Sequence, residues 1–300
     1  MSAGLVCGEA PPPVRSDNLA GRSVGNRPPA APEAASRMKF SIITPCYNSA
    51  RFLAESMDSV RAQRASGVEV EHLLADGGST DGSLDILRAR APELTWWVSE
   101  KDHGPASAIN KGFARASGDI VAWINADDRY EPGAFARVAE VFARHPEVAF
   151  VFGRCPIMDE RGREIRRGIT RLKELMFPVS CRVFHQCINY ISQPTLFFRR
   201  SALEKAGPLR EDWVAAWDYE FILRLWHQGR GHLVKGGPLA WFRWRHDSIS
   251  GSRYEIQFRE ELEACIADAG PWSLQTLAHR FVRHAIIASY RRMNRAKVAS

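Results

Sequence analysis

The sequence lacks several features that would place the protein in a specialised class. It has no run of about 18 apolar residues, so we expect no membrane-spanning helix. Its N-terminus has no basic start followed by an apolar core, so we expect no secretory signal. Six cysteines are scattered without a Cys-x-x-Cys pair, which predicts free thiols in a reducing compartment. The chain also lacks a Gly-x-Gly-x-x-Gly or Walker lysine loop, which argues against a standard dinucleotide or P-loop site.

Basic charge is concentrated at the ends of the chain. Residues 281–300 hold five Arg or Lys and no acid, and residues 1–37 hold four Arg against three acids. Subtracting these contributions from the net charge of +7 leaves +1 for residues 38–280. A nucleic-acid-binding protein needs a basic face on its folded body, so we expect no nucleic-acid partner.

Residues 1–37 and the segment that follows differ sharply in composition. The first segment is rich in Pro, Ala, Gly and Ser and cannot bury enough apolar surface to fold, so we predict a disordered tail. Strand and helix signals then alternate from residue 40 to residue 152. The predicted strands cover 40–44, 68–75, 96–98, 120–124 and 148–152, and the predicted helices about 49–60, 80–89, 104–116 and 132–144. This alternation predicts an α/β fold with a mostly parallel, Rossmann-like sheet flanked by helices.

The pattern is looser beyond Gly153. We expect strands at 195–198 and 239–244 and helices at 201–206 and 218–228. The five arginines of residues 161–171 predict a solvated charged loop, with a loop that holds an anionic acceptor as the alternative. Residues 256–296 are predicted to be mostly helical, which makes residues 256–300 a helical, basic C-terminal extension.

Apolar residues recur at helical spacing in this extension. One stripe comprises Leu274, Leu277, Phe281 and Ala285, and another comprises Val282, Ile286, Tyr290 and Met293. We expect these stripes to pack on the body of the protein. The alternative is that they lie on an anionic membrane surface, since basic residues follow them.

Polar residues follow each of the first four predicted strands, at 45–48, 76–79, 101–104 and 125–128. Parallel strands place their carboxyl ends on one edge of a sheet, where open α/β sheets bind ligands. Tyr47 offers a ring for packing against a base, and Asp76 can accept a hydrogen bond from a base or ribose. Asp127 and Asp128 repel each other, and a divalent cation shared with a diphosphate would remove that repulsion. The alternative for these two acids is an ordinary surface turn.

Taken together, these segments resemble the family 2 glycosyltransferases of the GT-A fold. The resemblance covers residues 39–250 and rests on the order and spacing of four motifs. They are Ser41-Ile-Ile-Thr-Pro-Cys-Tyr-Asn48, Asp76-Gly-Gly-Ser-Thr-Asp-Gly-Ser83, Asn110-Lys-Gly112 with Ala116-Ser-Gly-Asp119, and Asn125-Ala-Asp-Asp128. The resemblance implies a GT-A domain over residues 38–255. It also implies inverting transfer from a nucleotide-diphosphate sugar, with Mn²⁺ or Mg²⁺ on the diphosphate.

The resemblance implies roles for single residues. The residues expected to bind the nucleotide sugar are Pro45, Tyr47, Asn48, Asp76, Asn110, Asn125 and Asp127. Asp128 is expected to be the direct metal ligand, with Asp127 and the late-loop His246 as further ligands. Gly77 stands where the family's Asp-Asp-Gly-Ser motif has its second acid. This departure removes a carboxylate from the base and ribose site, and we favour a UDP-sugar as the donor.

An inverting displacement needs a base that deprotonates the acceptor hydroxyl. The family places an Asp or Glu for this role at the start of a late helix, which here matches Asp218, with Glu220 and Asp212 as the next candidates. An ordinary helix N-cap is the alternative role for Asp218. Gln193-Pro194-Thr195 resembles the family segment that lines the acceptor side.

The leading hypothesis is therefore a glycosyltransferase that acts on a glycan or lipid-linked acceptor in cell-envelope polysaccharide biosynthesis. The expected location is cytoplasmic, and the alternative for the C-terminal stripes adds peripheral contact at the inner membrane surface through the basic C-terminus. Two alternatives remain open. One is a sugar-phosphate nucleotidyltransferase, although the segment 45–48 lacks the Gly-rich basic loop of such enzymes. The other is a non-catalytic scaffold that binds nucleotide sugars.

Overall fold

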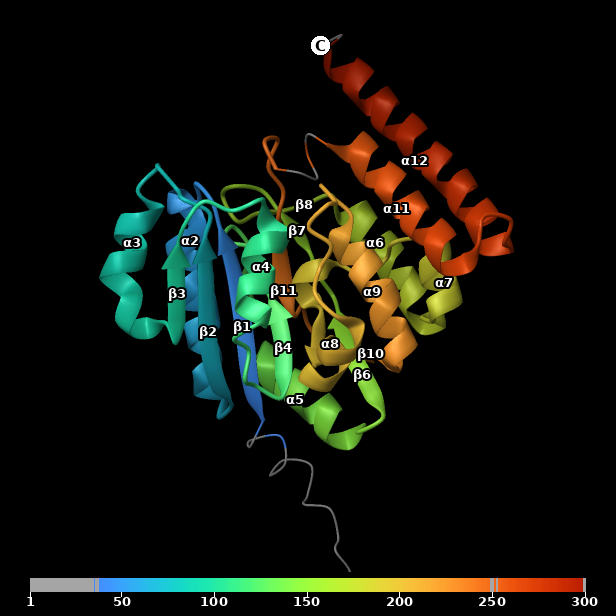
Figure 1. Cartoon of the computed structure of the whole chain (residues 1–300). Coiled ribbons are helices and arrows are strands. Elements are labelled where there is room, and N and C mark those ends of the chain that lie inside the picture. The colour runs from blue at the N-terminus through green and yellow to red at the C-terminus, as the bar shows by residue number, and fades with distance from the viewer. Residues whose placement is uncertain (1–34, 36–37, 249–250, 252, 299–300) are drawn as a thin grey trace, which may run out of the picture.

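The computed structural model describes residues 35, 38–248, 251 and 253–298. The disordered tail predicted for residues 1–37 therefore lies outside the described residues, apart from residue 35. Within the described part, a seven-stranded sheet forms the centre of the molecule, and helices cover both of its faces (Figure 1). The α/β class that the sequence predicts is thus confirmed.

The central sheet has the strand order β10-β6-β9-β4-β1-β2-β3. Its strands are β1 (Lys39–Cys46), β2 (Glu69–Asp76), β3 (Trp96–Ser99), β4 (Ile120–Trp123), β6 (Val148–Gly153), β9 (Phe197–Arg199) and β10 (Arg230–Val234). Strand β9 runs antiparallel to both of its neighbours, and the other neighbouring pairs are parallel. The carboxyl ends of β1, β2, β3 and β4 consequently meet at one edge, as the alternating pattern predicts.

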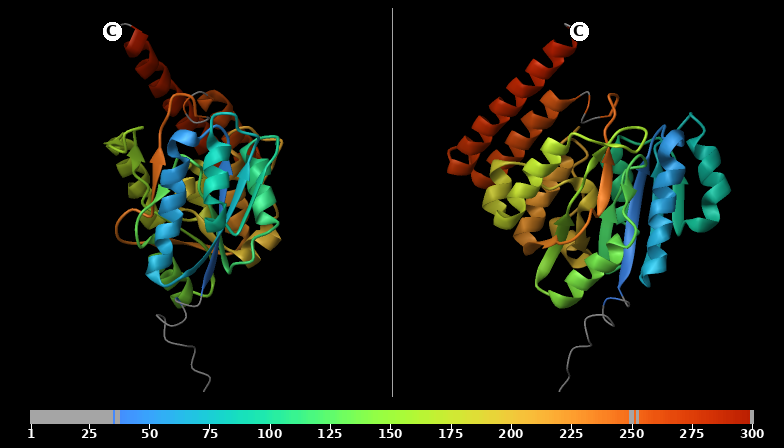
Figure 2. Two further views of the ribbon diagram at one scale, coloured as in Figure 1. Left: turned by 90° about the vertical axis from the view of Figure 1, so that its left-hand side faces the viewer. Right: turned by 180° about the vertical axis from the view of Figure 1, so that it is seen from behind.

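Ten α-helices accompany the sheet in the described part of the chain. They are α2 (Ala50–Arg61), α3 (Ser83–Arg90), α4 (Pro105–Phe113), α5 (Ala134–Arg144), α6 (Arg167–Met176), α7 (Arg182–Cys187), α8 (Arg200–Ala206), α9 (Trp217–Gln228), α11 (Tyr254–Ala269) and α12 (Leu274–Val298). Helices α4, α8 and α9 pack on one face of the sheet, and α2 and α5 pack on the other (Figures 1 and 2).

Neighbouring residues of the strands bury their side chains on opposite faces of the sheet, as the two-residue period of a strand requires. Ile42 and Phe197 belong to the core under α2 and α5, whereas Ile43 and Phe198 belong to the core under α4, α8 and α9. These strands read as continuous apolar runs because both faces of the sheet are covered.

A second, four-stranded sheet in the order β5-β11-β7-β8 is built from short segments. Its strands are β5 (Arg129–Tyr130), β7 (Ile157–Met158), β8 (Glu164–Ile165) and β11 (Ala240–Arg243). β5 begins directly after Asp128, and β11 pairs with it, so this sheet brings the late part of the chain to the acidic end of β4.

Two local predictions are wrong. The first strand does not end at residue 44 before Pro45, as predicted, since Pro45 pairs in register with Ala75 inside β1. The pairing of β1 with β4 ends at Ile43 and Trp123, so the missing N–H of Pro45 interrupts no ladder there. Residues 161–171 are not a continuous loop, because β8 and the first half of α6 lie within them.

The C-terminal extension is helical, as predicted, and α11 and α12 pack against each other (Figure 1). The prediction that the first apolar stripe packs on the body is wrong, because Leu274 is 81% exposed and Phe281 is 78% exposed. Helix α12 instead buries the side chains of Thr276 and His279. None of the helices among the described residues combines the length and apolar character needed to cross a membrane.

Candidate functional site

The loops after β1 and β2 are tied together at the carboxyl edge of the sheet. The backbone N–H of Asn48 donates to Ser79 Oγ at 2.8 Å, and the N–H of Thr80 donates to Asn48 Oδ1 at 2.9 Å. Asn48 has a positive φ of 47°, a conformation that Asn tolerates better than most residues. Tyr47 beside it is 65% exposed. The edge therefore presents a free aromatic ring above a fixed turn.

Asp76 is fully buried at the end of β2. Its carboxylate accepts hydrogen bonds from the N–H groups of Gly78 and Ser79 at 3.1 and 3.0 Å, from Ser99 Oγ at 2.6 Å and from Ser79 Oγ. Burial opposes ionisation, but the hydrogen bonds from Ser79 and Ser99 outweigh it and lower the pKa of Asp76. Asp76 thus organises this loop as an ionised carboxylate. The prediction that it contacts the donor stays a prediction.

Asp102 occupies the space next to Gly77. A Cβ atom at position 77 would lie 2.9 Å from Asp102 Oδ2 and 3.0 Å from Oδ1. The Asp102 carboxylate, on the loop after β3, also accepts the N–H of Gly104 at 2.9 Å and is half-buried. An acid from the third strand end therefore lies beside the position where the resemblance noted a missing acid. The sequence offered one signal for it, since residues 101–104 are among the polar strand ends.

Asp127 and Asp128 follow β4 and lie in different surroundings. Asp128 is 1% exposed, and its carboxylate accepts the N–H of Arg243 at 2.7 Å and Asn125 Nδ2 at 3.2 Å. Burial, and then the charge of Asp127, raise the pKa of Asp128 well above its ordinary value. The Asp127 side chain is 19% exposed and lies 3.5 Å from Arg245 Nη1. Burial raises its pKa too, against the opposing effect of Arg245.

Asp127 and Asp128 form an acidic corner at the end of the sheet. Two arginines from near the C-terminal end of the sheet domain, Arg243 and Arg245, contact it. Arg243 is 2% exposed, and its Nε donates to the carbonyl oxygen of Asp127 at 2.7 Å and its Nη2 to Glu55 Oε2 at 2.6 Å. Arg245 forms a second ion pair, with Asp247 at 2.6 Å. Sequence reasoning missed both arginines, because 115 residues separate Arg243 from Asp128 along the chain. Their spacing on either side of Trp244, just before His246, is the signal that was available.

The acidic corner fits a divalent cation. Burial raises the pKa of both adjacent carboxylates, and the charge of Asp127 further raises the pKa of Asp128. A cation would relieve this repulsion. Among the described residues, no group of three or more His, Cys, Asp or Glu gathers as a metal site. The protein thus offers two carboxylates here. Mg²⁺ commonly takes one or two carboxylates and fills its remaining positions with water and substrate phosphate.

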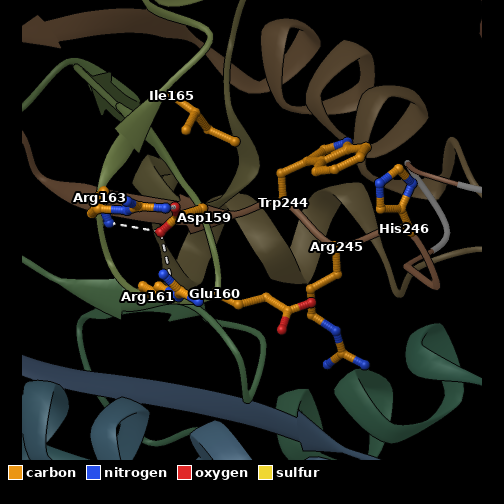
Figure 3. Close-up of a pocket in the computed structure, with 8 residues that line it drawn as sticks. All are labelled: Asp159, Glu160, Arg161, Arg163, Ile165, Trp244, Arg245 and His246. Atoms are coloured by element: carbon orange, nitrogen blue, oxygen red, sulfur yellow. Dashed lines mark hydrogen bonds and ion pairs between the residues drawn. The ribbon is translucent and has the colours of Figure 1, made fainter. Parts of the chain in front are cut away.

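A pocket of about 400 Å³ opens beside Arg245 (Figure 3). It is lined by Asp159, Glu160, Arg161, Arg163, Ile165, Trp244, Arg245 and His246. Trp244 and His246 lie together on one side, with ring centroids 4.4 Å apart, and Asp159 with its arginine partners lies on the other. The Arg166 guanidinium stacks over Trp244 at 3.9 Å. The pocket therefore combines an aromatic surface with arginines next to Asp127.

Asp218 lies in the first turn of α9, next to the end of β4. The neighbouring Trp217 packs on Trp123 of β4 with ring centroids 5.8 Å apart, and Gln193 Nε2 donates to the Trp123 carbonyl at 2.8 Å. Asp218 is partly exposed and its Oδ1 accepts the N–H of Tyr219 at 2.7 Å. Burial raises the pKa of Asp218 to about 6, although the N–H of Tyr219 favours the ionised form. An acid that titrates there is ionised at neutral pH and still able to take up a proton.

Asn110 of α4 forms its side-chain hydrogen bonds with the segment before α9 and not with the ends of the first strands. Its Nδ2 donates to the Leu209 carbonyl at 2.9 Å and to Glu211 Oε1 at 2.8 Å, and its Oδ1 accepts the Leu209 N–H at 2.8 Å. Asn110 therefore fastens the segment that leads into α9. The predictions that Asn110 contacts the donor and that His246 binds metal stay predictions.

Solved glycosyltransferase structures share this fold. A structure of S. aureus TarS residues 1–349 in complex with UDP-GlcNAc matches with a TM-score of 0.60 and 20% identity, covering 77% of this chain and 67% of that chain. The mannosyltransferase PcManGT from Pyrobaculum calidifontis, in complex with GDP-Man and Mn²⁺, matches with a TM-score of 0.54 and 20% identity. That match covers 86% of this chain and 80% of the PcManGT chain. These similarities confirm the GT-A type of fold.

Curated sequences are also similar. An uncharacterized glycosyltransferase of Nostoc sp. is 33% identical over 177 residues, which cover 57% of this chain and 54% of that protein. A PGL/p-HBAD biosynthesis glycosyltransferase of Mycobacterium bovis is 33% identical over 186 residues, which cover 60% of this chain and 67% of that protein. The match thus spans little more than half of the Nostoc relative. The family model for glycosyl transferase family 2 matches residues 41–207, and the chain therefore belongs to that family.

Proposed function

We propose that the protein is an inverting glycosyltransferase that moves a sugar from a nucleotide-diphosphate sugar to a hydroxyl of a glycan or lipid-linked acceptor. One observation carries the proposal. Asp218, a carboxylate whose pKa is raised to about 6, lies at the start of α9 beside β4, the strand that Asp127 and Asp128 follow. This arrangement places a base on one side of the site and, on the other, two carboxylates that would hold a metal-bound diphosphate.

The proposed reaction is a single displacement at the anomeric carbon. Asp218 takes the proton of the acceptor hydroxyl, the acceptor oxygen forms the new glycosidic bond, and the bond from the anomeric carbon to the diphosphate oxygen breaks. The nucleoside diphosphate leaves, and the configuration at the anomeric carbon inverts. Asp127 and Asp128 are the residues that would hold a divalent metal. When bound, the metal offsets the charge of the leaving diphosphate.

The donor is proposed to lie across the ends of β1, β2 and β3. Tyr47 is exposed and able to pack against the base, and the Asp102 carboxylate lies against Gly77. We propose that Asp102 supplies a carboxylate to the base and ribose site and accepts hydrogen bonds from the nucleoside. The TarS structure with UDP-GlcNAc supports a UDP-sugar as the donor, whereas PcManGT binds GDP-Man.

Acceptor binding is proposed at the pocket of Figure 3 and at the segment that precedes α9. Trp244 is able to pack against a sugar ring, and the arginines of the pocket suit an acceptor that carries negative charge. The name of the Mycobacterium bovis relative supports an envelope glycolipid or glycan as the product. The exposed Trp272, Leu274 and Phe281 support peripheral contact with a membrane on which a lipid-linked acceptor would lie.

A thermal-shift panel tests the proposal. UDP, GDP, dTDP and CMP are each added with and without Mn²⁺ to the wild type and to Asp127→Asn and Asp128→Ala. We expect one nucleoside diphosphate to stabilise the wild type only with Mn²⁺, and the two variants to lose that stabilisation. The control is Asp85→Asn, on the exposed first turn of α3. A flat panel, or a shift without release of nucleoside diphosphate from the matching nucleotide sugar, would favour the scaffold alternative.

A further inference from the structure

The carboxylate of Glu260, on α11, accepts hydrogen bonds from three consecutive backbone N–H groups just before α9. The N–H of Val214 donates to Oε1 at 3.0 Å, and those of Ala215 and Ala216 donate to Oε2 at 2.8 and 2.9 Å. Glu260 is 5% exposed. Both oxygens of this buried carboxylate therefore accept hydrogen bonds from the three residues that precede Trp217. Asp218 is the residue directly after Trp217.

These three bonds fix the segment that leads into α9. The three N–H groups belong to the N-cap residue Ala216 and the two residues before it, and α9 has no side-chain cap of its own. Glu260 thus anchors this segment from a different helix, and its negative charge suits the positive end of the α9 dipole. Without Glu260, buried N–H groups would lack partners, so the turn that carries Asp218 would rearrange.

The next residue of α11, Glu261, and Lys173 of α6 act on Asp218 with opposite charges. Glu261 raises the pKa of Asp218 and Lys173 lowers it. Both side chains are held in place, because Glu261 Oε1 accepts Asn189 Nδ2 and Gln257 Nε2, each at 3.0 Å, and Lys173 Nζ donates to Ser192 Oγ at 3.1 Å. The two side chains, on α11 and α6, therefore act electrostatically on the same carboxylate.

The other charges in contact with α9 lie near its far end, where Arg182 of α7 and Asp268 of α11 pair with each other and contact His227, nine residues after Asp218. His185 of α7 is buried near Tyr219, and burial lowers its pKa to about 3, so it is neutral at working pH. On α8, Arg200 and Glu204 pair with each other at the surface. Strand β6 contributes apolar residues and one glycine. Lys173 and Glu261 are accordingly the charges whose removal tests the field at Asp218.

We propose that α11 is part of the active site, with Glu260 as a positioning residue that fixes the segment leading to Asp218, while Glu261 and Lys173 act on Asp218 through their charges. The inference rests on the proposed role of Asp218 as the base. It assigns a function to a helix that lies outside residues 41–207, the segment that the family model matches. Variation in α11 would then change catalysis as well as stability.

The test is an NMR titration of the Asp carboxyl carbons in full-length protein labelled with ¹³C-aspartate. The Asp218 resonance is the one that disappears in Asp218→Asn. Removing the positive charge with Lys173→Met is expected to move its titration midpoint up by about 0.5 to 1 pH unit, and Glu261→Gln to move it down by about as much. Glu263→Gln is the matched control, because Glu263 lies on the same helix but is solvent-exposed and paired with Arg259. Shifts in the same direction, or none, would overturn the inference.

Glu260→Gln tests the positioning role. An amide turns its NH₂ group toward one of the donors, so hydrogen exchange at residues 214–216 is expected to rise about tenfold or more. The Asp218 midpoint is expected to fall toward that of an exposed Asp, because the carboxylate leaves its buried place. Faster exchange with an unchanged midpoint would show a merely structural role. If Glu260→Gln does not fold, the opposite shifts in the other two variants still decide the inference. Failure of the base assignment is separate, since Asp218→Asn would then keep transferase activity.

Discussion

Replacing Asp218 by Asn is expected to reduce transfer strongly and to stabilise the protein. The Asn side chain has nearly the same shape and keeps an oxygen for the N–H of Tyr219, which donates to Oδ1 at 2.7 Å. The substitution removes a charge that its surroundings disfavour, since burial raises the pKa of Asp218 to about 6 from its ordinary value of 3.8. A residue kept for function at a cost in stability is typical of an active site.

The magnitude follows from linkage. At about 1.4 kcal/mol per pH unit, the difference between 3.8 and about 6 corresponds to roughly 3 kcal/mol. Asp218 is partly exposed, so solvent screening reduces this to about 1 to 2 kcal/mol. The sign is fixed by proton uptake. Between pH 3.8 and 6 the native state binds more protons at Asp218 than the unfolded state, so the stability of the wild type falls as pH rises through that interval, and the full penalty is present above it.

Urea unfolding of wild type and Asp218→Asn at pH 4, 5, 6, 7 and 8 measures this effect. The stability difference is expected to be small at pH 4 and to grow to about 1 to 2 kcal/mol above pH 6, with transfer reduced about 10²- to 10⁴-fold. Asp212→Asn is the control, because the hydrogen bond from Arg210 lowers the pKa of Asp212, so this variant should gain no stability. A stability difference that does not change with pH would refute the reasoning.

Three further predictions concern other parts of the molecule. Glu71→Gln should lower the free energy of unfolding in urea by about 2 to 3 kcal/mol at pH 7. The reason is that hydrogen bonds from Lys39, Ser41 and Ser117 overcome the effect of burial and lower the pKa of Glu71 to about 2. The wild type should lose this stability as pH falls from 4.5 toward 2. Asp102→Asn should reduce the melting shift produced by UDP with Mn²⁺, while Asp85→Asn should leave it unchanged. Changing Trp272 and Phe281 to Ser should reduce sedimentation with anionic vesicles without lowering the melting temperature, because both side chains are exposed; unchanged sedimentation would exclude membrane contact through this surface.

The sequence predicts the first half of the fold well because each signal there is local. Strand β4 is a short apolar run, α5 has apolar residues at helical spacing, and both lie close to their predicted bounds. Predictions were weaker where a long-range partner decides the conformation. The arginine-rich segment 161–171 has no strong pattern of its own, yet α6 begins within it and turns Thr170 and Lys173 toward the protein interior.

The site divides along the same line. The motif residues at the ends of β1, β2 and β4 could be predicted, because parallel strands bring their ends together whatever the side-chain details. Arg243 and Asp102 could not be assigned roles from sequence, since one acts through contact with Asp128 and the other through its closeness to Gly77. Both contacts depend on tertiary packing, which no local pattern encodes.

The donor site and the proposed base lie in different parts of the chain, and this separation bears on how such an enzyme changes its acceptor. The residues proposed to hold the donor lie within residues 41–207, which the family model matches, whereas Asp218, Glu260 and Arg243 lie beyond it. Glu260 of α11 holds the segment that leads to the proposed base, and α11 also packs on α12. A change in the C-terminal helices would therefore reach the base without touching the donor site. Acceptor choice and base strength can then vary together, while the donor chemistry stays constant.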